Sequence, residues 1–348
     1  MISQGGFTLA STTKTKALLL GQLLILSSVL AACGNDSNSE SAVSPSASAS
    51  GSAAAATSAA PAESAPASEE ASAYPLTVTD ELGHTITIPA KPERVFAPTM
   101  EDSLLALGVT PAIQWSNGVE PQNYLQDLLA GVPEISYGEG SPSFEAILEQ
   151  EPDLIVLHNS YYADEGLYEQ YSKIAPTYAF KSASEDLDGA IRTLGQLLGE
   201  EAKAEEAKQQ YSARVEAAKT QLGSLSEGKR AAIIRFNAKG MFFMNSGYFS
   251  GYVLTHELGF GESNLVTEGA FEVSLEALPT LDADYIFLIN DGHLGDAALK
   301  SLKISAVWNS LAAVKEGRVF ETNADYWLSG GYIAQGKVVD DVVGFLTP

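Results

Sequence analysis

The sequence has 348 residues and carries 44 aspartates and glutamates against 20 lysines and arginines, a formal net charge of −24. This acidity argues against nucleic acid as a partner, because the phosphate backbone binds basic surfaces. A single cysteine rules out a disulfide within the chain and a thiolate metal cluster.

The first predicted element is a secretion signal. Lys14 and Lys16 precede an apolar run at residues 17–30, and small residues lead from this run into Cys33. About 14 apolar residues are too few to span a bilayer, which takes about 20. We therefore expect a signal peptide at residues 1–32, whose removal takes away two lysines and no acid. The remainder then has 18 basic and 44 acidic residues, a net charge of −26.

A low-complexity linker is predicted at residues 33–73, where Ser, Ala and Pro dominate. Such a segment buries too little apolar surface to offset the entropy lost on ordering, so we expect a flexible tether. About 275 residues remain, enough for two domains with their own cores. We predict an N-terminal lobe at residues 74–182, a bridging helix within 183–222 and a C-terminal lobe at 223–348.

Strands and helices alternate along both predicted lobes. Residues 76–89 alternate in polarity around a turn and predict a hairpin. Further strands are expected at 94–97, 112–115 and 153–157, then at 231–236, 285–289 and 318–321; helices are expected at 101–107 and 144–150, then at 252–258, 275–278, 298–302 and 333–345. This order predicts an α/β fold of two Rossmann-like lobes with mainly parallel sheets.

The lobes are expected to be joined by a single long helix. Apolar residues recur at helical spacing before and after Gly199, which interrupts the pattern. A helix over residues 200–222 would be about 35 Å long at about 1.5 Å per residue. Only one such crossing is visible in the sequence, so we expect the lobes to move little against each other.

One sequence unit occurs twice. The stretch at residues 143–159 aligns without a gap with residues 274–290. Seven positions are identical: Ser143/Ser274, Glu145/Glu276, Ala146/Ala277, Asp153/Asp284, Ile155/Ile286, Leu157/Leu288 and Asn159/Asn290. A helix-loop-strand unit present once in each lobe explains the repeat, and two similar lobes imply a ligand cleft between them.

Several short motifs give the chain a family resemblance from about residue 74 onward. They are TDELG at 79–83, IP and PERV at 88–95, LLALGV at 104–109, PDLIV at 152–156, and VWNSL with GRV at 307–319. In this order, behind a lipobox-like Cys33, the chain resembles the iron-siderophore substrate-binding proteins of bacterial ABC importers. The resemblance implies two lobes bridged by one helix, no catalysis and no cofactor. It also implies a monomer held by a lipid on Cys33 at the outer face of a Gram-positive cell membrane.

The repeated glutamates have two possible roles. Glu145 and Glu276 each follow a serine by two residues, which places both carboxylates in a first helical turn and complements the helix dipole. The resemblance adds a second role, since one surface glutamate per lobe at this motif pairs with arginines of the permease. We expect permease docking at both positions, and the two roles are compatible.

Ligand-binding candidates follow from the strand ends, because sites in such folds lie beyond the carboxyl ends of parallel strands. Any of these side chains could instead be ordinary core, and Arg235 could form a surface ion pair. In the resembled family an arginine at the position of Arg235 contacts the ligand. The candidates are Met100, Trp115, Asn159, Tyr161, Tyr162, Arg235, Asn237, Asn290, His293, Tyr326 and Trp327.

Missing basic residues bear on the ligand. No Lys or Arg lies between Arg94 and Lys173, so the first lobe offers its half of the cleft almost no positive charge. A ferric tricatecholate, with about three negative charges, would be poorly compensated there. We expect a ferric hydroxamate or a mixed citrate-hydroxamate complex. The segment at 323–331 is also similar to the hydroxamate-binding branch of the family.

Other readings remain open from sequence. Haem is an alternative ligand, because Met100 and His293 could supply axial groups from two sides of a cleft, and a catecholate siderophore is another; cobalamin has no specific support. The chain lacks the common hydrolase, zinc-protease and nucleotide-binding motifs, so an enzyme is not expected. A surface adhesin would also agree with the lipobox and linker, but it leaves the paired glutamates unexplained.

Overall fold

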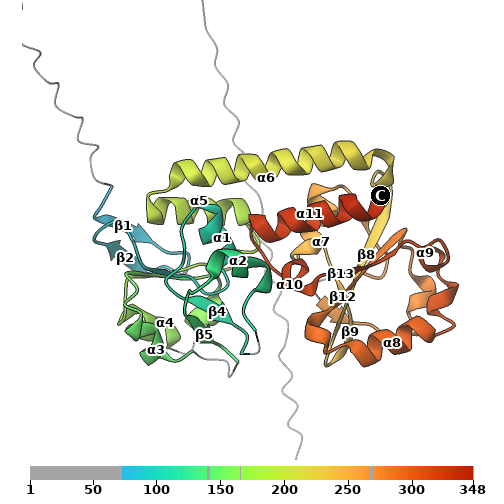
Figure 1. Cartoon of the computed structure of the whole chain (residues 1–348), viewed down its shortest axis with the longest axis horizontal. Coiled ribbons are helices and arrows are strands. Elements are labelled where there is room, and N and C mark those ends of the chain that lie inside the picture. The colour runs from blue at the N-terminus through green and yellow to red at the C-terminus, as the bar shows by residue number, and fades with distance from the viewer. Residues whose placement is uncertain (1–72, 119, 139–141, 165, 267–269, 348) are drawn as a thin grey trace, which may run out of the picture. The chain divides into compact units, whose positions relative to one another are not determined.

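The computed structural model describes residues 73–347 except 119, 139–141, 165 and 267–269. The signal peptide, Cys33 and the linker up to residue 72 lie outside the described residues. Within the described part, no helix combines the length and apolarity required to cross a membrane. The predicted fold class is confirmed, since parallel sheets and a long helix make up the described chain (Figure 1).

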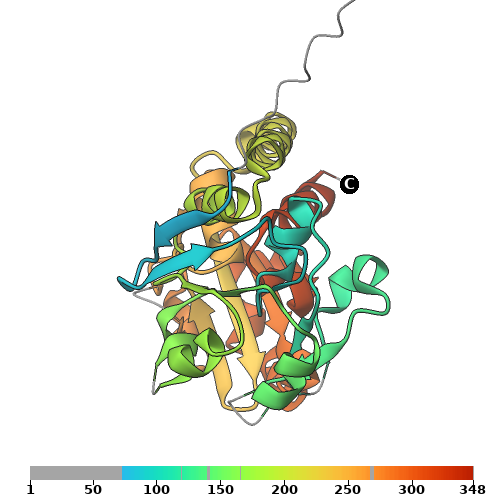
Figure 2. The same cartoon turned by 90° about the vertical axis from the view of Figure 1, so that its left-hand side faces the viewer.

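The first lobe begins with the predicted hairpin. Strands β1 (Leu76–Thr79) and β2 (Thr85–Ile88) pair antiparallel. Asp80 fixes their turn, because its carboxylate accepts hydrogen bonds from the backbone N–H groups of Leu82 and His84. The hairpin lies below the helical layer of the lobe (Figure 2), and its inward side chains, Ile86 and Ile88, join the larger core.

Two small parallel sheets follow in this lobe. Strands β3 (Val95–Phe96), β6 (Leu154–Leu157) and β7 (Thr177–Ala179) form one, and β4 (Gln114–Ser116) pairs with β5 (Glu134–Ser136) in the other. A bridge between Phe96 and Ile113 links them. All four residues of β6 are buried, as expected for the centre of a parallel sheet. Strands β5 and β7, of three residues each, were not predicted.

Short helices connect these strands. They are α1 (Glu101–Ala106), α2 (Gln126–Leu129) after the 3₁₀ turn η1 (Asn123–Leu125), α3 (Phe144–Glu149), the 3₁₀ helix η2 (Ser160–Ala163) and α4 (Leu167–Ser172).

The bridge consists of two helices. Helix α5 (Leu187–Leu198) ends at Gly199, whose φ of 62° is a left-handed conformation that suits glycine, and α6 (Glu201–Leu222) then runs from one lobe to the other (Figure 1). The helices are in close contact, because a Cβ at Gly195 would lie 2.8 Å from the Cβ of Ala204. The helical pattern and its interruption are as predicted.

The second lobe contains the largest sheet among the described residues. Its order is β11 (Ala270–Glu272), β9 (Gly240–Met244), β8 (Arg230–Asn237), β12 (Tyr285–Asn290), β13 (Val319–Thr322), and β10 (Gly261–Glu262) also pairs with β8. Strands β8, β12 and β13 are parallel and correspond to the predicted strands. The antiparallel pairing of β9 with β8 and β11 was not predicted.

Several helices of the second lobe differ from the prediction. A three-residue α7 (Ser250–Tyr252) and a π-helix η4 (Val253–Glu257) replace the helix expected at 252–258. The helix expected at 275–278 is a turn that leads into the 3₁₀ helix η5 (Leu278–Thr280), in which Pro279 lies at a first-turn position. The remaining helices are η3 (Gly223–Leu225, 3₁₀), η6 (Asp291–His293, 3₁₀), α8 (Asp296–Ile304), η7 (Trp308–Ser310, 3₁₀), α9 (Ala312–Lys315), α10 (Ala324–Trp327) and α11 (Tyr332–Leu346).

Helix α11 is a second brace that the sequence did not reveal. It lies alongside α6 and also contacts α1 of the first lobe (Figure 1). The buried carboxylate of Asp102, in α1, accepts hydrogen bonds from the N–H groups of Ile333 (3.0 Å) and Ala334 (2.8 Å) in the first turn of α11. Asp102 therefore caps a helix that begins 230 residues later.

A reciprocal contact runs in the opposite direction. Asp325, in α10 of the second lobe, accepts hydrogen bonds from the backbone N–H groups of Asn123 (3.2 Å) and Tyr124 (2.5 Å) of η1. The Tyr332 hydroxyl donates to Asp188 of α5. One continuous core cluster includes buried residues of both lobes and of α5, α6 and α11. The two lobes are thus held by carboxylates as well as by apolar packing.

Candidate functional site

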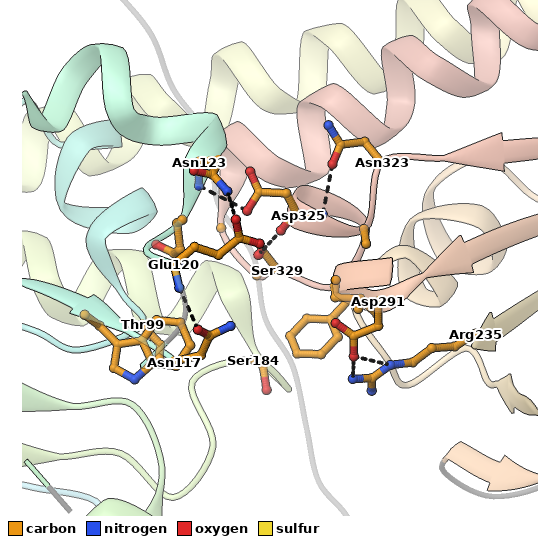
Figure 3. A pocket seen from close by; sticks show the side chains of 18 of the residues that line it. Thr99, Asn117, Glu120, Asn123, Ser184, Arg235, Asp291, Asn323, Asp325 and Ser329 are labelled. Carbon is orange, nitrogen blue, oxygen red and sulfur yellow. Dashed lines mark hydrogen bonds and ion pairs between the residues drawn. The ribbon is translucent and has the colours of Figure 1, made fainter. Parts of the chain in front are cut away.

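A cavity of about 1200 Å³ lies between the lobes, and both contribute to its walls. Thr99 comes from the first lobe, while Arg235 and Asp291 come from the second (Figure 3). Met100 and Trp115 of the first lobe also line the cavity. The volume slightly exceeds the upper end of the range common for small-molecule sites.

The carboxyl ends of the parallel strands supply the walls. Trp115 belongs to β4, His158 follows β6, Arg235 lies near the end of β8, and Asn290 ends β12. Thr322 is the last residue of β13 and also lines the cavity. This is the place where ligands bind in open α/β sheets, so the topology itself selects the cavity as the site.

Six of the residues expected from sequence lie together in this cavity: Met100, Trp115, Tyr162, Arg235, Asn290 and His293. Met100 is buried, whereas the His293 side chain is 88% exposed. The part each plays toward a ligand stays a prediction.

Five other candidates do not line the cavity. The Asn159 side chain is hydrogen-bonded to His158, and Tyr161 is 66% exposed away from the cavity lining. The Asn237 side chain accepts hydrogen bonds from backbone N–H groups in the turn from β8 to β9. Trp327 is fully buried and its indole N–H donates to Asp341, as does the Tyr326 hydroxyl. These two aromatic side chains were expected in the cleft, but α10 directs them toward α11 instead.

Arg235 is the one lysine or arginine among the described residues that line the cavity. Its guanidinium donates through Nε, at 3.2 Å, and through Nη2 to the same oxygen of Asp291 (Figure 3). Four carboxylates line the same cavity: Glu120, Asp291, Glu321 and Asp325. The lining therefore carries more acidic than basic side chains. The sequence had predicted only a shortage of basic residues in the first lobe.

Hydrogen bonds hold the carboxylates at the junction of the lobes. Glu120 accepts from the Asn123 side chain, and Asp325 accepts from the backbone of η1 (Figure 3). Burial raises the pKa of Asp325, the N–H groups of Tyr124 and Asn123 counteract it, and the charge of Glu120 raises it again.

His158, the histidine of the first lobe that lines the cavity, is neutral near pH 7. Burial lowers the pKa of His158 to about 4. Its Nδ1 lies 2.6 Å from the Thr99 hydroxyl oxygen and its Nε2 lies 2.7 Å from the Asn159 side-chain nitrogen. Both ring nitrogens are thus engaged within the wall. No cluster of three or more His, Cys, Asp or Glu side chains suited to a metal ion occurs among the described residues.

Backbone strain is concentrated at the cavity. Thr99, Phe249 and His293 have φ angles of 65°, 39° and 60°, and all three line the walls. Side-chain-bearing residues adopt such angles rarely, at a cost of about 1–3 kcal/mol each, and they do so mainly at functional sites. This strain supports the cavity as the site independently of its shape.

Sequence reasoning missed several polar lining residues, among them Asn117, Glu120, Ser184, Asp291, Asn323 and Asp325. Asp291 could have been found, since it directly follows the repeated strand that ends at Asn290. No local pattern marks Glu120. Asp325 lies in the segment at 323–331 that is similar to the hydroxamate-binding branch, but the sequence did not single it out as a lining residue.

The repeated glutamates lie outside the cavity, and both are exposed. Glu145 occupies the first turn of α3, where the Ser143 hydroxyl oxygen accepts a hydrogen bond from the Ala146 N–H. Glu276 lies in a turn rather than a helix, so the predicted helical setting holds for one copy only. A hydrogen bond from Ser274 lowers the pKa of Glu276.

Two α/β lobes with a ligand-sized cleft between them are the architecture of a solute-binding protein. The model of the family described as periplasmic binding protein matches residues 96–326, more than half of the chain. The chain belongs to the periplasmic binding protein family. Membership in a family of binding proteins agrees with the prediction that the chain is not an enzyme.

Two relatives and one solved structure show which members of the family the chain is similar to. The chain is 29% identical over 295 residues to the probable siderophore-binding lipoprotein YfiY of Bacillus subtilis, covering 79% of this chain and 89% of the relative. It is 29% identical over 308 residues to the iron(3+)-hydroxamate-binding protein FhuD of the same organism, covering 86% and 87%. The structure is similar to that of Staphylococcus aureus SirA complexed with staphyloferrin B, with a TM-score of 0.68, 26% identity and coverage of 78% of this chain and 98% of SirA.

Proposed function

We propose that this protein is anchored at the outer face of the cell membrane by a lipid on Cys33, binds a ferric siderophore in the cleft and delivers it to an ABC permease. The observation that carries the proposal is the cavity of about 1200 Å³ at the strand ends, between two braced lobes. The names of the relatives, a siderophore-binding lipoprotein and an iron-hydroxamate-binding protein, support the ligand class and the anchor.

Within that class we favour a ferric hydroxamate or a mixed citrate-hydroxamate complex. One arginine faces four carboxylates in the lining, so a complex with several negative charges would meet little compensation. Ferric catecholates and haem are the alternative ligands. For haem, Met100 and His293 do line the same cavity, although Met100 is buried in its wall.

Tryptophan fluorescence provides the test. Trp115 lines the cavity, whereas Trp308 and Trp327 are buried in the cores. Titration of the purified protein with ferric hydroxamates, ferric catecholates, ferric citrate and haem should quench Trp115 with a ferric hydroxamate at the lowest concentration. Trp115→Phe should remove most of the quenching. If none of these ligands quenches the fluorescence, siderophore binding is refuted. If haem or a ferric catecholate binds most tightly, that ligand replaces the hydroxamate in the proposal.

The anchor has its own test. Cys33→Ala should move the protein from the membrane fraction to the medium and abolish labelling with a radioactive fatty acid, since the thiol is the acceptor of the lipid. Continued labelling of this variant with the fatty acid would show that Cys33 is not the lipid acceptor.

A further inference from the structure

Arg235, the one arginine among the described residues that line the cleft, is already paired with a carboxylate. The Arg235 guanidinium directs two of its nitrogens at one carboxylate oxygen of Asp291, and the two side chains are 27% and 31% exposed. A partly buried pair of this kind is screened less by salt than a pair on the open surface. The charge of Arg235 is therefore offset by Asp291 before an anion arrives, although the pair uses only two of the five N–H donors of the guanidinium.

The backbone fixes this pairing. Strands β8 and β12 are parallel, with Arg235 opposite Ile289, so Asp291 follows only two residues beyond the partner position. Asp291 begins the 3₁₀ turn η6, in which the Leu294 N–H donates to the Asp291 carbonyl oxygen, and Gly292 and His293 both have positive φ. The turn places the Asp291 carboxylate next to the guanidinium before any ligand arrives.

The other charges of the cleft do not restore positive potential. Glu120 and Asp325 accept hydrogen bonds only from neutral donors among the described residues. Glu321 pairs with Lys303, which does not line the cavity. An anionic ligand would thus enter a site whose unpaired charges are negative, and like-charge contact suppresses binding of the wrong partner.

We propose that Asp291 is a specificity-determining residue: by holding Arg235 in an ion pair, it makes the cleft reject ferric complexes with net negative charge and accept neutral and positively charged ones. Within the proposed ligand class this selects a ferric hydroxamate over a mixed citrate-hydroxamate complex, whose carboxylate and alkoxide donors leave it with a net negative charge. This inference rests on the proposed function and adds the charge class of the ligand. It also assigns that selection to a residue that the sequence did not single out.

A matched ligand series tests the inference. The ferric complexes of one linear trihydroxamate with a terminal amine, of its N-acetyl derivative and of its N-succinyl derivative share their iron-binding core. They carry one positive charge, no charge and one negative charge. Fluorescence titration of the wild-type protein should give the weakest binding for the succinyl complex, by about tenfold relative to the amine complex.

Asp291→Asn should improve binding of the succinyl complex by about tenfold and change binding of the acetyl complex by less than about threefold. The gain should vanish in the double variant Arg235→Gln/Asp291→Asn, because it depends on the released guanidinium. Glu316→Gln is the matched control: it removes a carboxylate from the Arg318–Glu316 pair, which lies outside the cavity lining, and it should behave as wild type. Thermal melting checks that each variant is folded.

The results separate the two proposals. If the wild-type protein binds none of the three complexes and no other ferric siderophore, the proposed function fails and the inference falls with it. If it binds them but takes the succinyl complex as tightly as the amine complex, only the inference is overturned. A gain in Asp291→Asn that persists without Arg235 would also overturn it.

Discussion

At the scale of single residues, Asp102 shows how a charge can be buried without loss of the fold. Burial raises the pKa of Asp102 to about 6, while the N–H groups of Ile333 and Ala334 and the Tyr124 hydroxyl counteract the rise. Gly331 makes room for this carboxylate, since a Cβ there would lie 2.1 Å from Asp102 Oδ1, and its φ is 108°. The acid and the glycine therefore form one structural unit at the start of α11.

Asp102→Ala should lower the free energy of unfolding by about 3 kcal/mol, because it leaves two buried N–H groups at a helix end without an acceptor. Urea denaturation followed by circular dichroism measures the change. Asp127→Ala, at an exposed first-turn position of α2, should change the value by less than about 0.5 kcal/mol. Equal effects of the two substitutions would contradict the capping role.

Glu101, the neighbour of Asp102, gives the protein a pH dependence. Burial raises its pKa from 4.5 to about 7, and the N–H of Trp115, a wall residue, donates to Glu101 Oε1 at 2.7 Å. A raised pKa means that the folded state holds the proton more tightly. The stability linked to Glu101 is therefore present below about pH 4.5 and is lost as the pH rises through about 7.

Glu101→Gln should thus gain stability relative to wild type as the pH rises from about 4.5 to 8, by at most about 3 kcal/mol. The free energy of unfolding at several pH values measures the difference. Glu149→Gln, which alters an exposed side chain of α3, is the control and should run parallel to wild type. A Glu101→Gln curve parallel to wild type would rule out this residue as the source.

At the scale of elements, the two copies of the repeated unit show what sequence identity does and does not determine. Both copies end in a buried central strand, β6 and β12. The first begins with a helix capped by Ser143, but the second begins with a turn, because Pro279 follows where the first copy has Leu148. A proline removes a backbone donor and limits the helix before it.

Ser143→Ala should therefore cost about 1 kcal/mol of stability, the usual value of a lost N-cap. Ser274→Ala should cost less than about 0.5 kcal/mol, since no helix begins there. Chemical denaturation of both variants provides the comparison, and a larger loss for Ser274→Ala would argue against the assignment.

The same distinction explains how far the sequence could predict this protein. Strands with long apolar runs, the helices of the bridge and the fold class were predictable because periodicity and burial agree locally. The short strands β5 and β7 and the antiparallel β9 and β11 depend on neighbours far along the chain. Trp327 was expected in the cleft because it follows a predicted strand. Its hydrogen bond to Asp341 in α11 could not be predicted from the local sequence.

At the scale of the whole molecule, two carboxylates and two helices hold the lobes. We expect their separation to change by less than about 2 Å when a ferric complex binds. Spin labels at Glu169→Cys and Lys300→Cys, with Cys33 replaced by alanine, would report the distance. The same labels in an Asp325→Ala background should show a broader distribution, and a large closure of the wild-type protein would contradict the braced arrangement.

Docking to the permease also belongs to the scale of the whole molecule, because we predict one contact from each lobe. Glu145→Ala together with Glu276→Ala should lower uptake of the ferric ligand by at least about tenfold while leaving binding unchanged. The matched pair Glu149→Ala and Glu272→Ala removes two other exposed acids and should leave uptake intact. Normal uptake by cells carrying the first pair would exclude these glutamates from docking.

The cap on α11 also sets an order of events during biosynthesis. Asp102 meets its partners only when residues 333 and 334, 231 and 232 positions later, have been made. Until then its buried carboxylate lacks those two donors, so the contact between α1 and α11 cannot form. We expect the contact between α1 and α11 to form late, when nearly all of the two lobes has been synthesised. If the chain is exported unfolded, as the proposed lipid anchor requires, we expect this late step to favour its translocation.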